Sequence, residues 1–380
     1  MPRKTKKKAP RKSASNTPHT LQKIASTIVL ILSIVSALAL IAASYAQYIN
    51  PLTTPIPALL GLAFPIFALS TIILFLLLLL LRPKYALPSF IALALAFPAI
   101  RQYFPINRGN DRLVTNQPGF SILSYNTFYF MDVEPDNESD KIGYNRTIQN
   151  IINADADIVV IQEGPINFPL KGKNRFTAEQ IAEINKRYPY QDLQSKGKLL
   201  SKYPFRTIAD TAYTLSAFTT IYEVEIDNRK VTLFNNHLES IGLTPDDTRL
   251  YLDLTSKPGS IDQKTEEIKS FTGKFLKAFK HRATQVEYIE TMAQKIGGNI
   301  IMCGDINDTP NSYAYHRLTQ NHRDAFLELG TGAGFTYLAN RIWVRIDYLL
   351  YKGDMSAQYI NVIGKRSSDH YPIYGEFEWK

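Results

Sequence analysis

The sequence predicts an α/β protein: a sandwich of mixed β-sheets covered by helices, preceded by an N-terminal helical transmembrane region. Two observations lead to this prediction. From about residue 104 onwards, short apolar runs bounded by turns recur and are interleaved with fewer helical patterns, which is typical of mixed sheets with helices on their faces. Before that point, residues 1–100 contain ten Lys or Arg and no Asp or Glu, and most of the stretch consists of uncharged apolar runs.

The N-terminal region divides into a tail and three apolar segments. Residues 1–22 are basic and rich in proline and serine, which predicts a disordered cytoplasmic tail. A transmembrane region is expected over 23–103, with segments at about 24–45, 57–81 and 85–100. The first two are long enough to cross a bilayer. A buried helical hairpin and a cleaved signal peptide both fit these runs less well.

The basic residues predict the orientation of this region in an inner or plasma membrane. The tail should stay in the cytoplasm, the uncharged loop "AQYINPLTTPIP" should lie outside, and Arg82 and Lys84 should lie inside. If 85–100 also spans the bilayer, everything after about residue 104 is extracytoplasmic. If it lies only at the interface, that part is cytoplasmic. The segment is marginal in length, and we favour the span.

The part after residue 100 is close to neutral. Subtracting the ten basic residues of 1–100 leaves 43 − 10 = 33 basic against 34 acidic groups. A general polyanion binder would need a basic footprint there, so this class is disfavoured. The single cysteine, Cys303, lies inside an apolar run and is expected to be a small buried side chain rather than a reactive thiol.

Strands and helices can be placed along this second part. Strands are predicted at 119–126, 157–163, 197–204, 219–226, 230–238, 299–305, 343–351 and 371–379. Helices are predicted at about 144–153, 177–187 and 264–296. The turn Asp227-Asn228-Arg229 should join two strands as a hairpin.

Polar side chains stand at the ends of most of these strands. They are Asn126, Glu163, His237, Asp305, Asn307, Asp347, Asp369 and His370. Singly, each has a structural explanation: an Asn can end a strand in a turn, and Asp347 could pair with Arg345 or Arg341. Together they are better explained by convergence, because loops at strand ends build ligand sites. Oxygen-rich donors of this kind suit Mg²⁺ or Mn²⁺ better than structural Zn²⁺.

The stretch "NIIMCGDINDTPNS" shows the pattern most clearly. An apolar run that ends at Cys303 is followed by Gly304, which permits close backbone approach. Asp305 and Asn307 are two residues apart and should face the same way, with Ile306 pointing back into the core. The following Asp308 and Pro310 are expected to start a turn and a helix.

The order of the motifs "SYN", "IQE", "NNHL", "GDIN", "RIDY" and "SDH" resembles that of the endonuclease/exonuclease/phosphatase superfamily. The resemblance covers about 115–380, and the corresponding domain is expected over 104–380. It implies a four-layer α/β sandwich with two mixed sheets packed face to face. It also implies metal-dependent hydrolysis of a phosphoester.

The resemblance further implies a role for each residue. Glu163 would be the principal Mg²⁺ ligand, with Asn126 beside it and Asp369 as an outer carboxylate or the ligand of a second metal. Asp305 would orient and deprotonate the attacking water, and Asn307 would fix that water or the phosphate.

Two histidines complete the implied site. His370 would contact the scissile phosphate, and Asp347 would accept its other ring proton. His237 would bind phosphate or assist the leaving group.

The expected function is a membrane-anchored, Mg²⁺-dependent phosphohydrolase, and a phosphodiesterase within that class. A nucleic acid and a lipid head group both stay open as substrates, although the acidic loop after Asn126 disfavours a long duplex. The segment 239–273 could form a lid or be an insertion without a substrate role. The alternative is an inactive membrane-bound scaffold that retains the fold. A transporter is disfavoured, because Ile24 to Leu81 contains no charge to work with.

Overall fold

The computed structural model describes residues 17–107, 119–133, 145–164, 176–242, 261–339, 342–363 and 366–380. Most of the expected tail, 1–22, lies outside the described residues, as do parts of the acidic loop and of the expected lid. The described chain forms two compact units. One comprises Met1–Ile41 and Pro65–Ala96, and the other comprises Ala42–Phe64 and Phe97–Lys380.

Apolar helices make up the N-terminal region, and this region is divided between the two units. The helices of the N-terminal region are α1 (Thr17–Tyr45), α2 (Ile56–Leu62), α3 (Phe64–Leu81) and α4 (Leu87–Tyr103), with 3-10 turns η1 (Ala46–Tyr48) and η2 (Pro83–Tyr85). Hydroxyl groups join these helices, since Ser36 Oγ lies 2.7 Å from Ser70 Oγ and 2.8 Å from Thr71 Oγ1. Such pairs are typical of helices that meet in an apolar medium.

Two of these helices, Lys23–Tyr48 and Phe64–Leu81, are long and apolar enough to cross a membrane. Membrane anchoring is thereby weakly suggested. The expected segment 57–81 is divided at Ala63 into α2 and α3, and α1 begins at Thr17, inside the expected tail.

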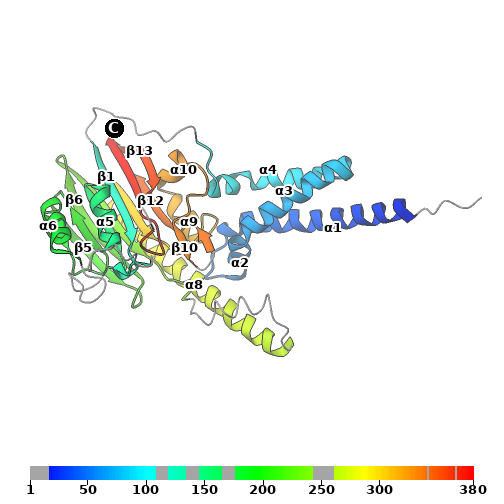
Figure 1. Cartoon of the computed structure of the whole chain (residues 1–380), viewed down its shortest axis with the longest axis horizontal. Coiled ribbons are helices and arrows are strands. Elements are labelled where there is room, and N and C mark those ends of the chain that lie inside the picture. The colour runs from blue at the N-terminus through cyan, green and yellow to red at the C-terminus, as the bar shows by residue number, and fades with distance from the viewer. Residues whose placement is uncertain are drawn as a thin grey trace, which may run out of the picture. The chain divides into compact units, whose positions relative to one another are not determined.

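Two six-stranded sheets form the centre of the second unit (Figure 1). The first sheet has the order β13-β14-β1-β2-β4-β3, with β1 Gly119–Asn126, β2 Ile158–Gln162, β3 Tyr190–Asp192, β4 Lys198–Ser201, β13 Met355–Val362 and β14 Ile373–Trp379. The second has the order β5-β6-β7-β8-β12-β9, with β5 Phe205–Ala212, β6 Phe218–Ile226, β7 Arg229–His237, β8 Asn299–Asp305, β9 Arg323–Asp324 and β12 Asp347–Lys352. Both sheets are mixed, because β1 runs parallel to β2 and β7 runs parallel to β8.

The inner faces of the two sheets share one apolar core. Ile122 and Ile158 of the first sheet and Leu233, Ile301 and Leu349 of the second are fully buried in it. Strands at the centre of such a sandwich are covered on both faces, which explains why β2 and β8 read as near-continuous apolar runs.

Helices cover the outer faces. The covering helices are α5 (Arg146–Ala154), α6 (Ala178–Arg187), α8 (Ile261–Ile296) and α9 (Tyr313–Thr319), whereas the short α10 (Ala325–Leu329) packs Ala325 and Phe326 into the core between the sheets. Ile148 of α5 and Ile184 of α6 pack on the first sheet, and Val286 of α8 and Leu318 of α9 pack on the second. The four-layer sandwich with two packed mixed sheets is therefore confirmed.

Local sequence accounts for the element boundaries. Asn145 accepts a hydrogen bond from the N–H of Ile148 and so caps α5. Asp227 and Asn228 adopt φ of 50° and 59° between β6 and β7, which is the two-residue hairpin turn that was expected. The expected strand 343–351 is instead two strands, β11 (Ile342–Val344) and β12. Between them Arg345 turns inward, and its Nη1 lies 2.7 Å from Asp324 Oδ2.

The chain that links the apolar helices packs into the second unit. Asn311 Nδ2 donates to the carbonyl oxygen of Ala43 at 2.7 Å, and Gln47 Nε2 donates to Asn311 Oδ1 at 2.9 Å. Asn50 Nδ2 donates to the Tyr313 hydroxyl at 3.1 Å. Gln47 and Asn311 are both buried. The loop after α1 is thus fixed to the segment that leads into α9.

Candidate active site

Strand register brings the expected site residues to one edge of the sandwich. In the second sheet, β7 and β12 flank β8, and the register pairs Asp305 with both His237 and Asp347. In the first sheet, Asn126 ends β1 opposite Gln162 of the parallel strand β2, so Glu163 follows directly beside it. Five of the polar strand ends therefore meet at the same edge.

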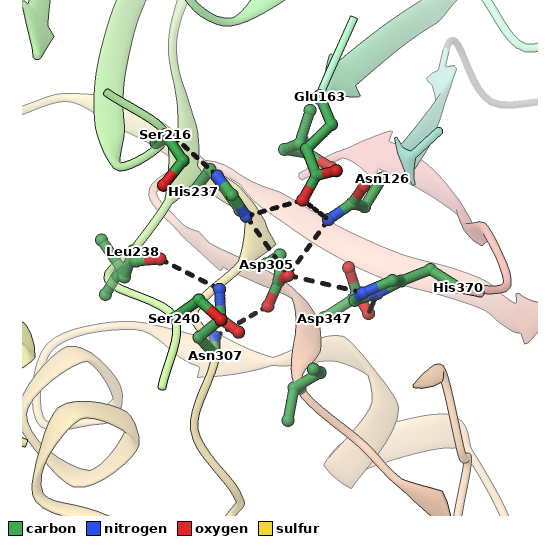
Figure 2. Close-up of polar contacts among 12 residues, drawn as sticks. Asn126, Glu163, Ser216, His237, Leu238, Ser240, Asp305, Asn307, Asp347 and His370 are labelled. Carbon is green, nitrogen blue, oxygen red and sulfur yellow. Dashed lines mark hydrogen bonds and ion pairs between the residues drawn. The ribbon is translucent and has the colours of Figure 1, made fainter. Parts of the chain in front are cut away.

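Asn126 bridges the two sheets at this edge (Figure 2). Its Nδ2 lies 3.2 Å from Glu163 Oε1 and 3.2 Å from Asp305 Oδ2. His237 Nε2 lies 3.3 Å from the same Glu163 oxygen and 3.6 Å from Asp305 Oδ2. Asn126, His237 and Asp305 are each at most 3% exposed, so these side chains are held by the core rather than by solvent-facing loops.

The two histidines both present Nε2 to Asp305. His237 Nδ1 lies 2.8 Å from the carbonyl oxygen of Ser216. Since a carbonyl only accepts, this nitrogen carries the proton and Nε2 faces the site. His370 Nδ1 lies 2.8 Å from Asp347 Oδ2, and its Nε2 lies 3.6 Å from Asp305 Oδ2. The Asp347–His370 pair is thus formed as the resemblance implies.

Arg345 is not the ion-pair partner of Asp347. Arg345 is bonded to Asp324 and to the carbonyl oxygen of Gln102, and Arg341 lies outside the described residues. Asp347 instead receives the Nδ1 proton of His370. A carboxylate in this position fixes both the tautomer and the orientation of the ring.

The segment from Gly304 to Asp308 holds the tip of β8 in place. Gly304 has φ of +118°, and a Cβ there would lie 2.0 Å from the carbonyl oxygen of Asn236, so only glycine fits. Asn307 donates its N–H to Asp305 Oδ1 at 2.7 Å and its Nδ2 to the carbonyl oxygen of Leu238 at 2.9 Å. Ile306 is buried in the core beneath the second sheet, as expected.

Asp369 is the expected site residue that the structure joins least to the others. Its Oδ1 accepts a hydrogen bond from Ser368 Oγ at 3.2 Å, and its carbonyl oxygen accepts one from the N–H of Leu338. Burial raises the pKa of Asp369, and the charge of Glu163 raises it further. Its role as a metal ligand stays a prediction.

Sequence reasoning missed several supporting groups. Asp308, which was expected only to begin a turn, forms a buried ion pair with Arg282 Nε at 3.0 Å. The Ser368 hydroxyl donates to the carbonyl oxygen of Asn126 at 2.9 Å. The ring of Tyr337 lies edge-on to His370, with centroids 5.0 Å apart. Only Ser368, the first residue of the "SDH" motif, carried a local signal, since the other contacts depend on long-range packing.

The buried charges perturb one another. Burial raises the pKa of Asp305 to about 6, with Asp347 adding to the effect and the two histidines opposing it. Burial is the largest single effect on Glu163 and opposes its ionisation, but the hydrogen bonds from His237 and Asn126 and the charges of the two histidines together lower its pKa below the ordinary value. Burial would lower the pKa of His370, whereas the Asp347 and Asp305 carboxylates raise it to about 10.

These residues fit a divalent cation. The carboxylates of Glu163, Asp305 and Asp347 converge with two imidazole rings. The raised pKa of Asp305 reflects a buried negative charge that lacks full compensation. Among the described residues, ligating atoms of Asp305, Asp347 and His370 lie within 4.8 Å of one another. The Asp347–His370 hydrogen bond already uses two of these atoms, so we favour Glu163 and Asn126 as the cation side of the site. Oxygen donors suit Mg²⁺ or Mn²⁺.

The fold and the geometry agree with the comparisons to known proteins. A family model described as the Endonuclease/Exonuclease/phosphatase family matches residues 123–370, and a model described as a domain of unknown function matches residues 26–103. No curated protein matches the sequence significantly.

Three of the solved structures that resemble the chain illustrate the range. A humanized D. rerio TDP2 is 16% identical, with 68% of this chain and 99% of that one covered and a TM-score of 0.42. The human Nocturnin catalytic domain with bound sulfate is 15% identical, with coverages of 70% and 97% and a TM-score of 0.42. A Bacteroides vulgatus endonuclease/exonuclease/phosphatase is 14% identical, with coverages of 69% and 99% and a TM-score of 0.38.

At these TM-scores, the structural likeness adds no argument about function. The family model spans most of the sandwich and includes the strand ends that converge on Asp305. The chain therefore belongs to the Endonuclease/Exonuclease/phosphatase family, whose members are metal-dependent enzymes that hydrolyse phosphoester bonds.

Proposed function

We propose that the chain is a Mg²⁺-dependent phosphodiesterase in which Asp305 activates the attacking water. One observation supports this above the others: β8 places Asp305 between His237 and the Asp347–His370 pair, while Asn126 links it to Glu163. The Asp305 carboxylate, the Nε2 atoms of the two histidines, and the side chains of Glu163 and Asn126 thus face one small volume.

The roles follow from what each group can donate or accept. Asp305 accepts the proton of water and is itself oriented by the N–H of Asn307. In their protonated forms, which the raised pKa of each ring favours, His237 and His370 each present an Nε2–H to the site and can donate to phosphate oxygens as negative charge builds up in the transition state. Bound at Glu163 and Asn126, a divalent cation would neutralise phosphate charge. With all these groups present, an inactive scaffold is disfavoured.

Turnover of a soluble diester tests this proposal directly. The full chain, purified in detergent, would be assayed on bis(p-nitrophenyl) phosphate with Mg²⁺ and with EDTA. Asp305→Asn and Glu163→Gln should each abolish the Mg²⁺-dependent rate, whereas Glu225→Gln, on the exposed face of the β6–β7 hairpin, should not change it. Unchanged turnover in Asp305→Asn would refute the assigned base. Folded protein without metal-dependent turnover would refute the enzyme function as proposed.

We also propose that α1, α3 and α4 all span the bilayer and that the catalytic sandwich lies on the side opposite the basic tail. The loop after α1 is bonded to the sandwich through Gln47 and Asn311. If α1 crosses the bilayer, this loop lies opposite the tail, and so must the sandwich that it contacts. Chain connectivity then requires α4 to cross as well, although it has only 17 residues.

Cysteine labelling tests the topology without any activity. Cys303 is buried, so a Cys303→Ser background leaves no native thiol. Single cysteines would replace Ser13 in the tail, Leu52 in the loop and Leu215 in the sandwich. A membrane-impermeant maleimide added to intact cells should label the last two and not the first. Labelling of Leu52→Cys without Leu215→Cys would refute the topology.

A further inference from the structure

Exposed apolar side chains gather around the mouth of the site. Among the described residues from 107 onwards, the exposed large hydrophobic residues are Tyr129, Met131, Tyr190, Leu215, Ile268, Ile342 and Trp343. Five of these seven, all except Tyr190 and Ile268, lie on three segments that also hold the site together. We call these five residues, Tyr129, Met131, Leu215, Ile342 and Trp343, the apolar rim.

Two segments of the apolar rim make hydrogen bonds to site residues, one to Glu163 and the other to His237. The N–H of Tyr129 donates to the carbonyl oxygen of Glu163 at 2.8 Å, and Tyr129 itself is 45% exposed. Leu215 is 97% exposed and immediately precedes Ser216, whose carbonyl oxygen accepts the Nδ1 proton of His237. A single exposed leucine is ordinary on a protein surface, so Leu215 matters only together with the other four residues of the apolar rim.

The third segment is the hairpin of β10 (Tyr337–Ala339) and β11. Tyr337 pairs with His370 in an isolated bridge, and its ring packs on the His370 ring. Ile342 pairs with Ala339, so it lies on the same face of the hairpin as Tyr337. Trp343 lies on the other face and is 61% exposed. The hairpin thus carries exposed apolar side chains on both faces, and the face with Ile342 is the one that it shares with Tyr337 beside His370.

The site also lies close to the ends of the apolar helices. Asn307, which is bonded to Asp305, is four residues from Asn311, which is bonded to Ala43 of α1 and to Gln47. Four residues of extended chain span at most about 14 Å. The headgroup layer on each face of a bilayer accounts for a depth of roughly 5–8 Å. In the topology proposed above, only these few residues separate the catalytic edge from the end of α1 that leaves the bilayer.

The charges at the site do not favour a nucleic acid. None of the hydrogen bonds or ion pairs made by the described side chains of Asn126, Glu163, His237, Asp305 or His370 comes from a lysine or arginine. Binding of a nucleic-acid strand depends on such cations along its phosphates. An amphiphile needs only one phosphate at the metal and an apolar surface beside it.

We propose that the substrate is the phosphodiester of a membrane lipid, with its headgroup phosphate at the metal and its apolar part against the apolar rim. This inference rests on the phosphodiesterase function proposed above. The oxygen of water bonds to phosphorus while one ester P–O bond breaks. The proton of water passes to Asp305, and the leaving oxygen takes up a proton. The products are a phosphomonoester and an alcohol, of which one stays in the bilayer.

Tryptophan quenching tests the membrane contact independently of turnover. The chain has two tryptophans, Trp343 and the buried Trp379. In the Trp379→Phe variant, Trp343 is the remaining tryptophan. Its fluorescence emission should be weaker in nanodiscs with dibrominated phosphatidylcholine than in nanodiscs with the unbrominated lipid. In a Trp343→Phe/Trp379→Phe background, Leu215→Trp should lose emission as well.

Tyr190 provides the matched control. It is 42% exposed but lies level with Ile158, at the start of β2 and hence at the far end of the first sheet. Tyr190→Trp in the same background should keep its emission in brominated discs. Absence of quenching at both Trp343 and Leu215→Trp would overturn the proposal, whether or not the enzyme is active. Equal quenching at Tyr190→Trp would also overturn it, because contact would then not be specific to the rim.

Turnover supplies the second test. Full-length protein with Mg²⁺ would be given vesicles of phosphatidylcholine, phosphatidylethanolamine and phosphatidylglycerol, a single-stranded DNA oligonucleotide, and bis(p-nitrophenyl) phosphate. Lipid hydrolysis should exceed DNA hydrolysis. Leu215→Ser and Ile342→Ser should each lower the ratio of lipid hydrolysis to soluble-diester hydrolysis about tenfold, the loss expected on removing one large aliphatic contact.

The outcomes separate the two proposals. Hydrolysis of the soluble diester and DNA, but not of any vesicle lipid, would refute the lipid substrate and keep the phosphodiesterase. Equal losses on vesicles and on the soluble diester in the rim variants would mean that the rim supports the fold rather than binds lipid, and would also refute it. No metal-dependent turnover of any substrate would refute the phosphodiesterase, and the quenching result would then decide membrane contact alone.

Discussion

Replacement of Arg282 by methionine should destabilise the catalytic sandwich more than any exposed ion-pair change. Arg282 is 1% exposed, its Nε lies 3.0 Å from Asp308 Oδ2, and its Nη1 donates to the carbonyl oxygen of Glu239 at 2.9 Å. It therefore joins the segment after Asn307 to the segment after His237. Arg282→Met leaves the buried Asp308 carboxylate without its cation, while the methionine occupies much of the same volume.

The expected size follows from this burial. Removing one partner of a buried ion pair costs about 3–5 kcal/mol. An unfolding entropy of about 2.1 cal/mol/K per residue over roughly 280 residues is about 0.6 kcal/mol/K, so the melting temperature should fall by about 5–8 °C. Thermal unfolding of the full chain in detergent, at one fixed scan rate, measures this shift.

An exposed pair gives the matched control. Arg206 Nε lies 2.9 Å from Glu223 Oε1, but the Arg206 side chain is 68% exposed. Exposed pairs contribute about 0–1 kcal/mol, so Arg206→Met should shift the melting temperature by less than about 2 °C. The double variant Arg282→Met/Asp308→Leu should recover part of the loss, because no unpaired charge stays buried. If Arg282→Met shifts no more than Arg206→Met, the buried pair does not hold these segments together.

Three further predictions concern the cation, the dyad and the helix junction. Mg²⁺ at about one hundred times its Kd should stabilise the fold by about 2.7 kcal/mol, and EDTA should reverse this gain in the free energy of unfolding. Glu163→Gln should reduce the gain, and an equal gain in Glu163→Gln would contradict the assigned ligand. Asp347→Asn should lower turnover of bis(p-nitrophenyl) phosphate about 10–100-fold with KM unchanged, because His370 loses the acceptor that fixes its tautomer; a rate within twofold of the parent would argue against the dyad. Gln47→Leu should cost about 1–3 kcal/mol in thermal unfolding, because Asn311 Oδ1 loses its buried donor; an unchanged melting temperature would show that the junction adds no stability.

Sequence reasoning located the site because strand ends are local features. Asn126, Asp305 and His237 each end an apolar run, and β8 spans Asn299–Asp305, the bounds expected from the sequence. The alternation of side chains along a strand then fixes which residues share a face. Register between strands is a property of the whole fold, so the sequence alone did not show that Asp347 would stand opposite Asp305.

The strands that the sequence did not predict are those in which packing against neighbours, rather than the apolar pattern, determines the structure. In β5, most side chains are exposed or half-buried, so the strand lacks a clear apolar face. Short strands such as β3 and β9 are stabilised by their neighbours rather than by propensity. Arg345 lies in a stretch that the sequence predicts as one continuous strand. Its guanidinium is buried among the rings of Phe326 and Tyr348, and the residues next to it in the sequence do not predict this environment.

The bond between Gln47 and Asn311 has a consequence for how the enzyme is made. The two residues are separated by 264 positions in the sequence, so the contact closes a very long loop and cannot form until nearly the whole chain has been synthesised. By then α1, α3 and α4 have long since left the ribosome. The segment that follows the catalytic Asp305 must therefore pack against a loop that was synthesised much earlier. In the topology proposed above, a chain in which α1 was misplaced would reach that step without a partner for Asn311, so assembly next to the site would depend on correct insertion of α1.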